Sequence, residues 1–412
     1  MLKKEFRSVQ VLVSFLVVAI TLIACKKLLP QAPPASETIA EPIEGLTDAQ
    51  LAMFMQGDAL FDKTYTPEEG LGPIFIQQAC AGCHVGDGKG HPINTVTRFG
   101  KSTPGGFDYM LSEGGPQLQQ RSIGGYLAET LPTGYTHTSD RIAPIVIGMG
   151  LLAALHDNTI LALADPNDLD GDGISGRVNY VQATSFFQAL SIHTDSAGYR
   201  IGRFGKKATK VTLLDQVVFA LKQDIGITSD YDTEDLFNHL VGVSTGDQAP
   251  DPEVSAAVVD RLVFYMRTLK APTRRNENDS EVLAGEVIFN DLGCVKCHAP
   301  TLTTDISEIS ALSQKTFHPY TDLLLHDMGP ALSDGYPEGN ANGNEWRTPP
   351  LWGLGLAEDS QGGIGYYLHD GRATTIKGAI GLHGGEASAV VANYFALSET
   401  DKDRLIKFLK SL

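Results

Sequence analysis

The apolar positions of this chain recur with a helical period in several separate stretches. The first begins at Thr47, after which Leu51, Met55, Ala59 and Leu60 recur at helical spacing. The same period predicts helices over 213–221 and 252–269 and over the last ten residues. Glycine-rich stretches at 100–115, 329–345 and 353–371 predict long loops. We therefore expect a mainly α protein with long loops.

Three features of this pattern occur twice, in the same order. Each copy has a Gly-x-x-x-Phe helix segment, an Arg-x-x-Pro segment that leads to Gly-x-Gly-Leu, and a closing helix that begins Asp-Arg-Leu. The first copy places them at 57–61, 141–151 and 260–269, and the second at 285–289, 347–356 and 403–412. Generic helices could explain the closing helices but hardly the paired Arg-Pro-Gly segments. The repeat predicts two similar domains that arose by internal duplication.

The predicted boundary between these domains is polar and has no apolar period. It covers 271–280, so that the N-terminal domain with its insertions spans 46–270 and the C-terminal domain spans 281–412. Residues 25–45 are rich in proline and poor in large apolar side chains, which indicates a tether.

The first 24 residues have the pattern of a signal peptide. A basic start is followed by a mostly apolar run over 11–23, and Leu22-Ile23-Ala24-Cys25 resembles a bacterial lipobox. Cleavage before Cys25 and acylation of its thiol would give a periplasmic protein anchored to a membrane by lipid. The alternative is an uncleaved transmembrane anchor, for which the apolar run is short.

Composition excludes some partners. The formal net charge of −17 becomes about −19 without the leader, because Lys3, Lys4 and Arg7 are offset only by Glu5. So acidic a surface argues against nucleic acid and is compatible with a basic electron-transfer partner, such as a small cytochrome or copper protein.

The cysteines carry the chemistry. The chain has five, and four of them occur in two Cys-x-x-Cys-His motifs, Cys80 and Cys83 with His84, and Cys294 and Cys297 with His298. This is the attachment signature of c-type haem, in which the thiols bind the porphyrin and the histidine binds its iron. A redox-active cysteine pair or a zinc site would not require the histidine. We expect two covalently bound haems c.

The sixth ligand of each iron determines what each haem can do. For the second haem we favour His383, since the glycines that follow it let the backbone approach a flat macrocycle. Its rivals are His369, His326 and Met328.

The first haem has no such candidate. His91, His137 and His156 follow the first motif, but none stands out, so an open or water-bound iron is the leading interpretation.

An aspartate-rich segment resembles the first half of a calcium loop. Asp168, Asp170 and Asp172 alternate, and Gly173 takes the sixth position. Asn179 stands at the twelfth position, where a calcium loop has glutamate, so an ordinary Asp/Gly turn is the alternative.

Several blocks of the sequence resemble the di-haem oxidoreductase family that is labelled peroxidase or thiol oxidoreductase. They are the first Cys-x-x-Cys-His motif, 141–152, 164–177, 202–205, 323–330 and 368–371. The resemblance covers almost all of 46–412.

A more distant similarity links the chain to bacterial di-haem cytochrome c peroxidases and the methylamine dehydrogenase maturation enzyme. In those proteins a Phe-His-Asp-Gly segment is followed, fourteen residues after its histidine, by the sixth ligand of the second haem. The same count here runs from His369 to His383. The resemblance thus implies that His383 is that ligand and that His369 has a structural or propionate-side role.

The chain also departs from those relatives. Gly100 stands where the peroxidases place a histidine that closes the first iron at rest, so the first haem is expected to be open without activation. Relatives often have tryptophan where this chain has Lys206, and its tryptophans are Trp346 and Trp352.

The resemblance implies a peroxidase-like reaction, in which peroxide or another small oxidant is reduced at the first haem with electrons relayed by the second. Such a pocket needs a proton-transfer group, for which Glu113, Glu129 and His156 are the sequence candidates. The alternatives are a non-enzymatic electron carrier, a redox component of metal uptake, and oxidation of a protein substrate.

Overall fold

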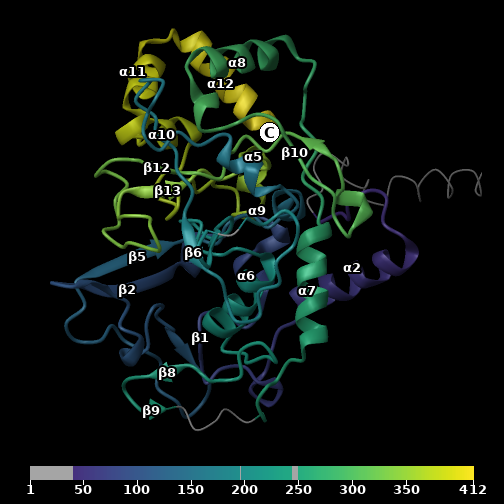
Figure 1. The fold of residues 1–412 in the computed structure, drawn as a ribbon, viewed down its shortest axis with the longest axis vertical. Coiled ribbons are helices and arrows are strands. Elements are labelled where there is room, and N and C mark those ends of the chain that lie inside the picture. The colour runs from purple at the N-terminus through teal and green to yellow at the C-terminus, as the bar shows by residue number, and fades with distance from the viewer. Residues whose placement is uncertain (1–39, 195, 244–248) are drawn as a thin grey trace, which may run out of the picture. The chain divides into compact units, whose positions relative to one another are not determined.

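The structure is a computed structural model that describes residues 40–194, 196–243 and 249–412 (Figure 1). The predicted signal peptide, Cys25 and most of the tether lie outside these ranges. Within them, no helix is both long enough and apolar enough to cross a membrane.

The described elements are short and mixed in type. The helices are α2 (Asp48–Phe61), α3 (Cys80–Cys83), α4 (Met149–Ala153), α5 (Asp157–Leu161), α6 (Leu213–Ala220), which continues as a π-helical turn (Leu221–Ile225), α7 (Ala256–Thr268), α8 (Ser280–Asp291), α9 (Ala357–Ser360), α10 (Ile376–Gly381), α11 (Ser388–Ala396) and α12 (Glu399–Ser411). The strands are β1 (Ile74–Phe75), β2 (Val96–Thr103), β3 (Gly106–Asp108), β4 (Arg121–Ser122), β5 (His137–Arg141), β6 (Tyr180–Gln182), β7 (Tyr199–Ile201), β8 (Phe237–Asn238), β9 (Gly242–Val243), β10 (Leu302–Thr303), β11 (Thr316–Phe317), β12 (Leu325–Asp327) and β13 (Glu345–Arg347).

The expectation of a mainly α protein is therefore met only in part, because strands accompany the helices. Of the residues that the structure describes, 33% are helical and 14% are in strands, which makes the fold mixed. Most strands have two or three residues. Many pair with the next strand along the chain, as β8 pairs with β9, whereas β1 pairs with the more distant β4. Strands this short carry no alternating pattern of their own, because tertiary packing rather than local sequence creates them.

Two helix pairs form the frame of the molecule (Figure 1), and the longer predicted helices are confirmed. In one pair α2, which Thr47 caps, lies against α7, and in the other α8 lies against α12. Gly57 makes the first approach possible, because a Cβ there would meet the Arg261 carbonyl and the Tyr265 side chain. Gly285 has the same place in the second pair, against Arg404 and Phe408.

A backbone hydrogen bond closes each pair in the same way. The amide of Gly148 donates to the carbonyl of Leu269 at 3.0 Å, and that of Gly353 donates to Leu412 at 2.8 Å. Both glycines have a positive φ, +70° and +72°, which glycine adopts without strain. Each Arg-Pro-Gly segment is thus tied to the end of its own closing helix.

The strands position the loops around the helix pairs. β3, β2 and β5 form an antiparallel sheet in which Val96 lies opposite Arg141. The antiparallel pair β12 and β13 places His326 opposite Trp346. The predicted loop at 329–345 connects these two strands, so it is confirmed as largely irregular.

Candidate active site

Both Cys-x-x-Cys-His motifs open onto a single cavity of about 460 Å³. It is lined by Cys80, Cys83 and His84 from the first motif and Cys294, Cys297 and His298 from the second. All four cysteines are free thiols. Burial raises the pKa of Cys80, Cys83 and Cys294 to about 12 and also raises that of Cys297.

The two motif histidines are in the protonation state that binds a metal. Burial lowers the pKa of His84 and of His298 to about 4, so both rings are neutral at neutral pH. Nδ1 of His298 lies 2.9 Å from the Tyr320 carbonyl oxygen, which leaves Nε2 free for iron. Nδ1 of His84 is buried without a hydrogen-bond partner, although carbonyls of Pro144 and Gly88 are close enough to affect its pKa.

A phenylalanine from the repeated Gly-x-x-x-Phe segment lies beside each motif histidine. The ring centroids of Phe61 and His84 are 5.9 Å apart, and those of Phe289 and His298 are 6.3 Å apart. Free thiols, neutral buried imidazoles and a common cavity fit two c-type haems, held by Cys80, Cys83 and His84 and by Cys294, Cys297 and His298.

His383 lines the same cavity, from the turn after α10. Its Nδ1 lies 2.7 Å from the Ala379 carbonyl oxygen, so Nε2 is again the free nitrogen. Burial lowers the pKa of His383, and a charge on His383 would in turn lower the pKa of His298, so the two rings are near each other. Both imidazoles would therefore be available to hold the second haem through its iron.

The other candidates for sixth ligand of the second haem differ in whether a side-chain atom is free to bind iron. Both nitrogens of His326 are occupied, Nε2 by Asp322 at 2.8 Å and Nδ1 by Glu386 at 2.8 Å. Burial would lower the pKa of His326, but hydrogen bonds to Asp322, Cys297 and Glu386 raise it to about 12, so this ring is a cation and a poor ligand. His369 stacks on Trp346 with centroids 3.7 Å apart. Met328 lines the cavity and remains the alternative.

None of the histidines considered as sixth ligand of the first haem lines this cavity. Nδ1 of His91 accepts a hydrogen bond from the Ile93 amide, and Nδ1 of His156 accepts one from the Asn158 amide. Nδ1 of His137 lies 2.8 Å from the Thr136 hydroxyl. These three histidines order local turns and strands, which leaves His84 as the one histidine of the first half at the cavity.

The sequence candidates for proton transfer also lie elsewhere. The carboxylate of Glu129 accepts a hydrogen bond from the Gln119 amide, and burial raises its pKa to about 8. Glu113 lies 3.8 Å from Lys101. Neither these glutamates nor His156 lines the cavity.

Asp224 is the acidic residue that sequence reasoning missed. It lines the cavity and accepts a hydrogen bond from Nε2 of Gln117 at 2.7 Å. Burial raises the pKa of Asp224 to about 6, against the effects of Gln117 and Arg98. The charge of Asp224 raises the pKa of both Cys80 and Cys83, so it lies near the first motif. The one local signal is its π-helical turn, a feature frequent at functional sites.

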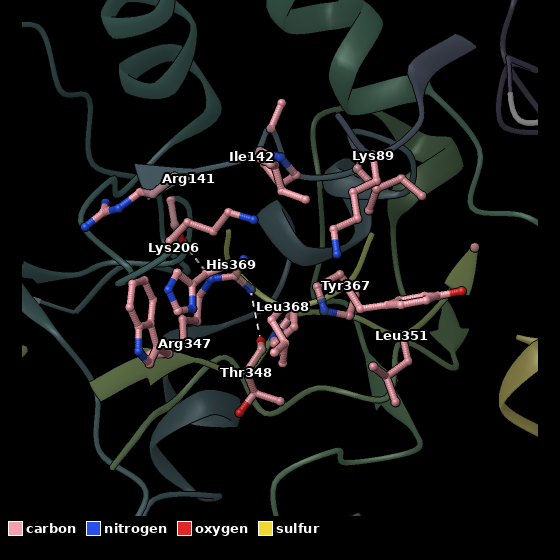
Figure 2. A pocket seen from close by; sticks show the side chains of 18 of the residues that line it. Lys89, Arg141, Ile142, Lys206, Arg347, Thr348, Leu351, Tyr367, Leu368 and His369 are labelled. Atoms are coloured by element: carbon pink, nitrogen blue, oxygen red, sulfur yellow. Dashed lines mark hydrogen bonds between the residues drawn. The ribbon is translucent and has the colours of Figure 1, made fainter. Parts of the chain in front are cut away.

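Figure 2 shows another part of the cavity, into which Lys89 and Lys206 extend. Arg347 and Tyr367 belong to the same wall. The three cations of this wall, Lys89, Lys206 and Arg347, could not be predicted to meet, because they come from three separate segments of the sequence.

The aspartate-rich segment is partly as predicted. Asp168 and Asp170 come together with Asp165, with carboxylate oxygens within 4.8 Å of one another. Asp172 instead forms an ion pair with Lys296 at 2.7 Å, which ties the segment to the second motif.

Comparison with known proteins agrees with the chemistry of this cavity. No curated protein matched the sequence. Among solved structures, hydrazine synthase from Kuenenia stuttgartiensis pressurized with 20 bar of xenon is similar at a TM-score of 0.38 and 15% sequence identity. The match covers 93% of this chain and 94% of that one, and it is too weak to indicate a shared function. A family model described as "Di-haem oxidoreductase, putative peroxidase" matches residues 130–412, which include the second motif and His383. The chain therefore belongs to the di-haem oxidoreductase family.

Proposed function

We propose that this protein is a di-haem c-type enzyme that reduces peroxide at the first haem, with electrons passed on by the second. One observation carries the proposal. Both motifs line one cavity, and the other histidines on its wall, His326, His369 and His383, all come from the second half of the chain. The first site is thus the one open to an oxidant.

The residues divide the work between the two sites. When bound, the haems supply one-electron redox chemistry and, at the first site, an iron with a free position. His84 and His298 would each bind the iron of one haem, and His383 would bind the iron of the second haem as well. This leaves the second site to transfer electrons only.

Peroxide reduction also needs protons, since one peroxide takes up two electrons and two protons to give two waters. The electrons come from a small redox protein outside the chain. Asp224 is our candidate for moving protons, because a pKa of about 6 lets its carboxylate accept and return a proton near neutral pH. Gln117 orients that carboxylate through its 2.7 Å hydrogen bond.

The optical and EPR spectra of the ferric protein test this proposal. We expect two covalently bound haems per chain, one high-spin and one low-spin, and turnover of hydrogen peroxide with a reduced donor. A purely low-spin spectrum without peroxide turnover would instead indicate an electron carrier. Cys297→Ser should weaken or abolish attachment of the second haem, while two zinc ions in the product would refute haem binding.

We also propose that the protein is exported and held at a membrane by lipid on Cys25. The lipobox-like residues before Cys25 support this, as does the need of c-type haem attachment for an exported chain. Mass spectrometry of the mature N-terminus should find an acylated Cys25, and Cys25→Ser should release the protein from membranes. An unmodified N-terminus at Met1 would contradict the proposal.

The two haem sites are best explained by duplication of one cytochrome c-like domain. The paired glycines of the helix crossings and the paired bonds from Gly148 and Gly353 support a common origin. The domain limits 46–270 and 281–412 remain a prediction.

Calcium at the aspartate-rich segment is a separate proposal. Asp165, Asp168 and Asp170 could supply oxygen ligands. Elemental analysis of the purified protein tests it, together with the loss of thermal stability on chelation. Asp170→Ala should reproduce that loss.

A further inference from the structure

Three cations lie on the cavity wall between the two motifs without a counter-ion. They are Lys89, Lys206 and Arg347, and they come from the loop after the first motif, the loop after β7 and strand β13. Figure 2 shows the two lysine side chains extending into the pocket. Within the described part of the chain, none of the three forms an ion pair with a carboxylate.

Their neighbours do not neutralise them. Nε of Arg347 donates to the Gly205 carbonyl at 3.0 Å and Nη1 donates to the Thr348 carbonyl at 3.1 Å, both uncharged partners. Nζ of Lys89 lies 5.6 Å from the centre of the Tyr367 ring. The carboxylate that acts on both lysines is Asp370, which is already paired with Arg372 at 2.6 Å.

Other cations of the same cavity show what a paired site looks like in this protein. Arg141 reaches Glu338 at 2.6 Å, and Lys210 reaches Asp215 at 3.2 Å. The structural cations therefore contact carboxylates directly. The carboxylates that act on these three, Asp370 on the lysines and Asp322 on Arg347, are instead paired with Arg372 and His326. Charged side chains are seldom buried without a partner, so an anion from outside the chain is expected here.

The protonation behaviour agrees with this geometry. Burial lowers the pKa of Lys89 to about 7 and that of Arg347 to about 10. Burial also lowers the pKa of Lys206 well below its usual value, and repulsion from Lys89, Arg347 and Arg141 adds to the effect. An anion among them would restore their charge.

We propose that Lys89, Lys206 and Arg347 form a carboxylate-binding site between the two haems, with Lys206 as its central member. The planar guanidinium of Arg347 suits two carboxylate oxygens, and each lysine adds a point charge. If the proposed function is right, the carboxylate side chains of the haems themselves are one source of the anion. A free small carboxylate is the other.

The test uses the full-length protein loaded with haem. The variants are Lys206→Met and Lys89→Met, with Lys206→Arg as the conservative substitution and the exposed Lys407→Met as the control. The midpoint potential of each haem is measured by spectroelectrochemistry in chloride buffer, with and without added acetate. A cation beside a haem carboxylate favours the reduced form, which is the more negative one. Removing the lysine charge should lower the equilibrium constant for one-electron reduction of the haem at least tenfold, which corresponds to a midpoint potential lower by about 59 mV.

The two sources give different results. The haem carboxylates are the source if both methionine variants have a lowered midpoint potential without acetate. In that case Lys206→Arg keeps a potential near that of the parent, and Lys407→Met does not change it. A parent protein whose potential shifts with acetate, and a Lys206→Met variant that no longer responds, identify a free carboxylate. Potentials that match the parent in both methionine variants, with no acetate response, would overturn the inference. Haem content by mass spectrometry tests the proposed function separately, because two haems can be present whether or not this site exists.

Discussion

At the scale of single residues, the proposed binding of His383 to iron would set the properties of the second haem. Methionine with histidine raises a haem potential, whereas two imidazoles stabilise the ferric iron and hold the potential lower. We therefore expect His383→Met to raise the potential of the second haem, by about 59 mV for each tenfold change in its reduction equilibrium. The first haem should keep its spectrum.

His383→Gly makes the complementary test, because it should open the second iron to imidazole or cyanide. Optical titration of the ferric protein checks both variants. If neither changes the low-spin signal, His383 is not a ligand, and Met328 becomes the next residue to substitute.

Asp224 allows a prediction about pH. A carboxylate can accept a proton only when it is ionised, and burial puts its pKa at about 6. If Asp224 takes the first proton from peroxide, kcat/KM rises with pH through about 6 and levels off above it. Asp224→Asn should lower the rate by about 10²–10⁴-fold and remove that limb of the profile.

Two controls separate this role from a structural one. Asp403→Asn changes an exposed aspartate of α12 and should leave the pH profile as it is. The haem content of Asp224→Asn should equal that of the parent. An unchanged profile in a fully loaded Asp224→Asn variant would show that Asp224 does not transfer the proton.

Some of the residues at the site could be predicted from the sequence, and others could not. The haem-attachment residues Cys80, Cys83 and His84 and their counterparts could be predicted, because the whole signature lies within five adjacent residues. His326 and His383 both precede glycine-containing segments, and the resemblance to the peroxidases favours His383. Packing gives an independent reason, because it closes His326 between two carboxylates. Asp224 reaches the cavity through a turn that has no sequence signature.

At the scale of elements, the two helix crossings depend on a glycine each. Gly285→Ala would force its Cβ against the Arg404 carbonyl and the Phe408 side chain. Overpacking of this kind typically costs 1–3 kcal/mol, so we expect about that loss in the free energy of unfolding. Gly57→Ala should have a similar effect in α2. Denaturant titration measures both.

Gly124→Ala is the matched control, because a Cβ at Gly124 meets no atom within 4 Å. Its stability should differ little from that of the parent. Equal stability of Gly285→Ala and Gly124→Ala would mean that α8 and α12 can separate without cost. The helices were predictable because their apolar period is local, whereas strands such as β1 and β4 exist only through partners far along the chain.

At the scale of the whole molecule, buried ion pairs connect the first half to the loop at 329–345. Glu338 lies 2.6 Å from Arg141 and also pairs with Arg98, and Asp334 lies 2.8 Å from Lys207. The sequence alone could not predict these ion pairs, because their partners lie far apart along the chain. They hold the loop between β12 and β13, and with it Trp346 and Arg347, against the first half.

Glu338→Gln tests how much this connection contributes. Burial raises the pKa of Glu338, but Arg141 and Arg98 outweigh burial and hold the pKa below its usual value. Removing the charge would leave two arginines poorly compensated, and such a change typically costs 3–5 kcal/mol. The exposed Glu358, which lies 3.5 Å from Lys410, provides the control, and Glu358→Gln should cost less than about 1 kcal/mol.

The pH dependence of that loss identifies its cause. Because the pKa of Glu338 is lower in the folded than in the unfolded protein, its ion pairs stabilise the fold fully at neutral pH. That stabilisation is lost as the pH falls from the unfolded value, about 4.3, through the folded one. The difference in unfolding free energy between the parent and Glu338→Gln should therefore be largest near pH 7 and shrink below about pH 4. A difference that stays constant over this range would mean that Glu338 acts by packing rather than by charge, and that the connection between the two halves does not depend on ion pairs.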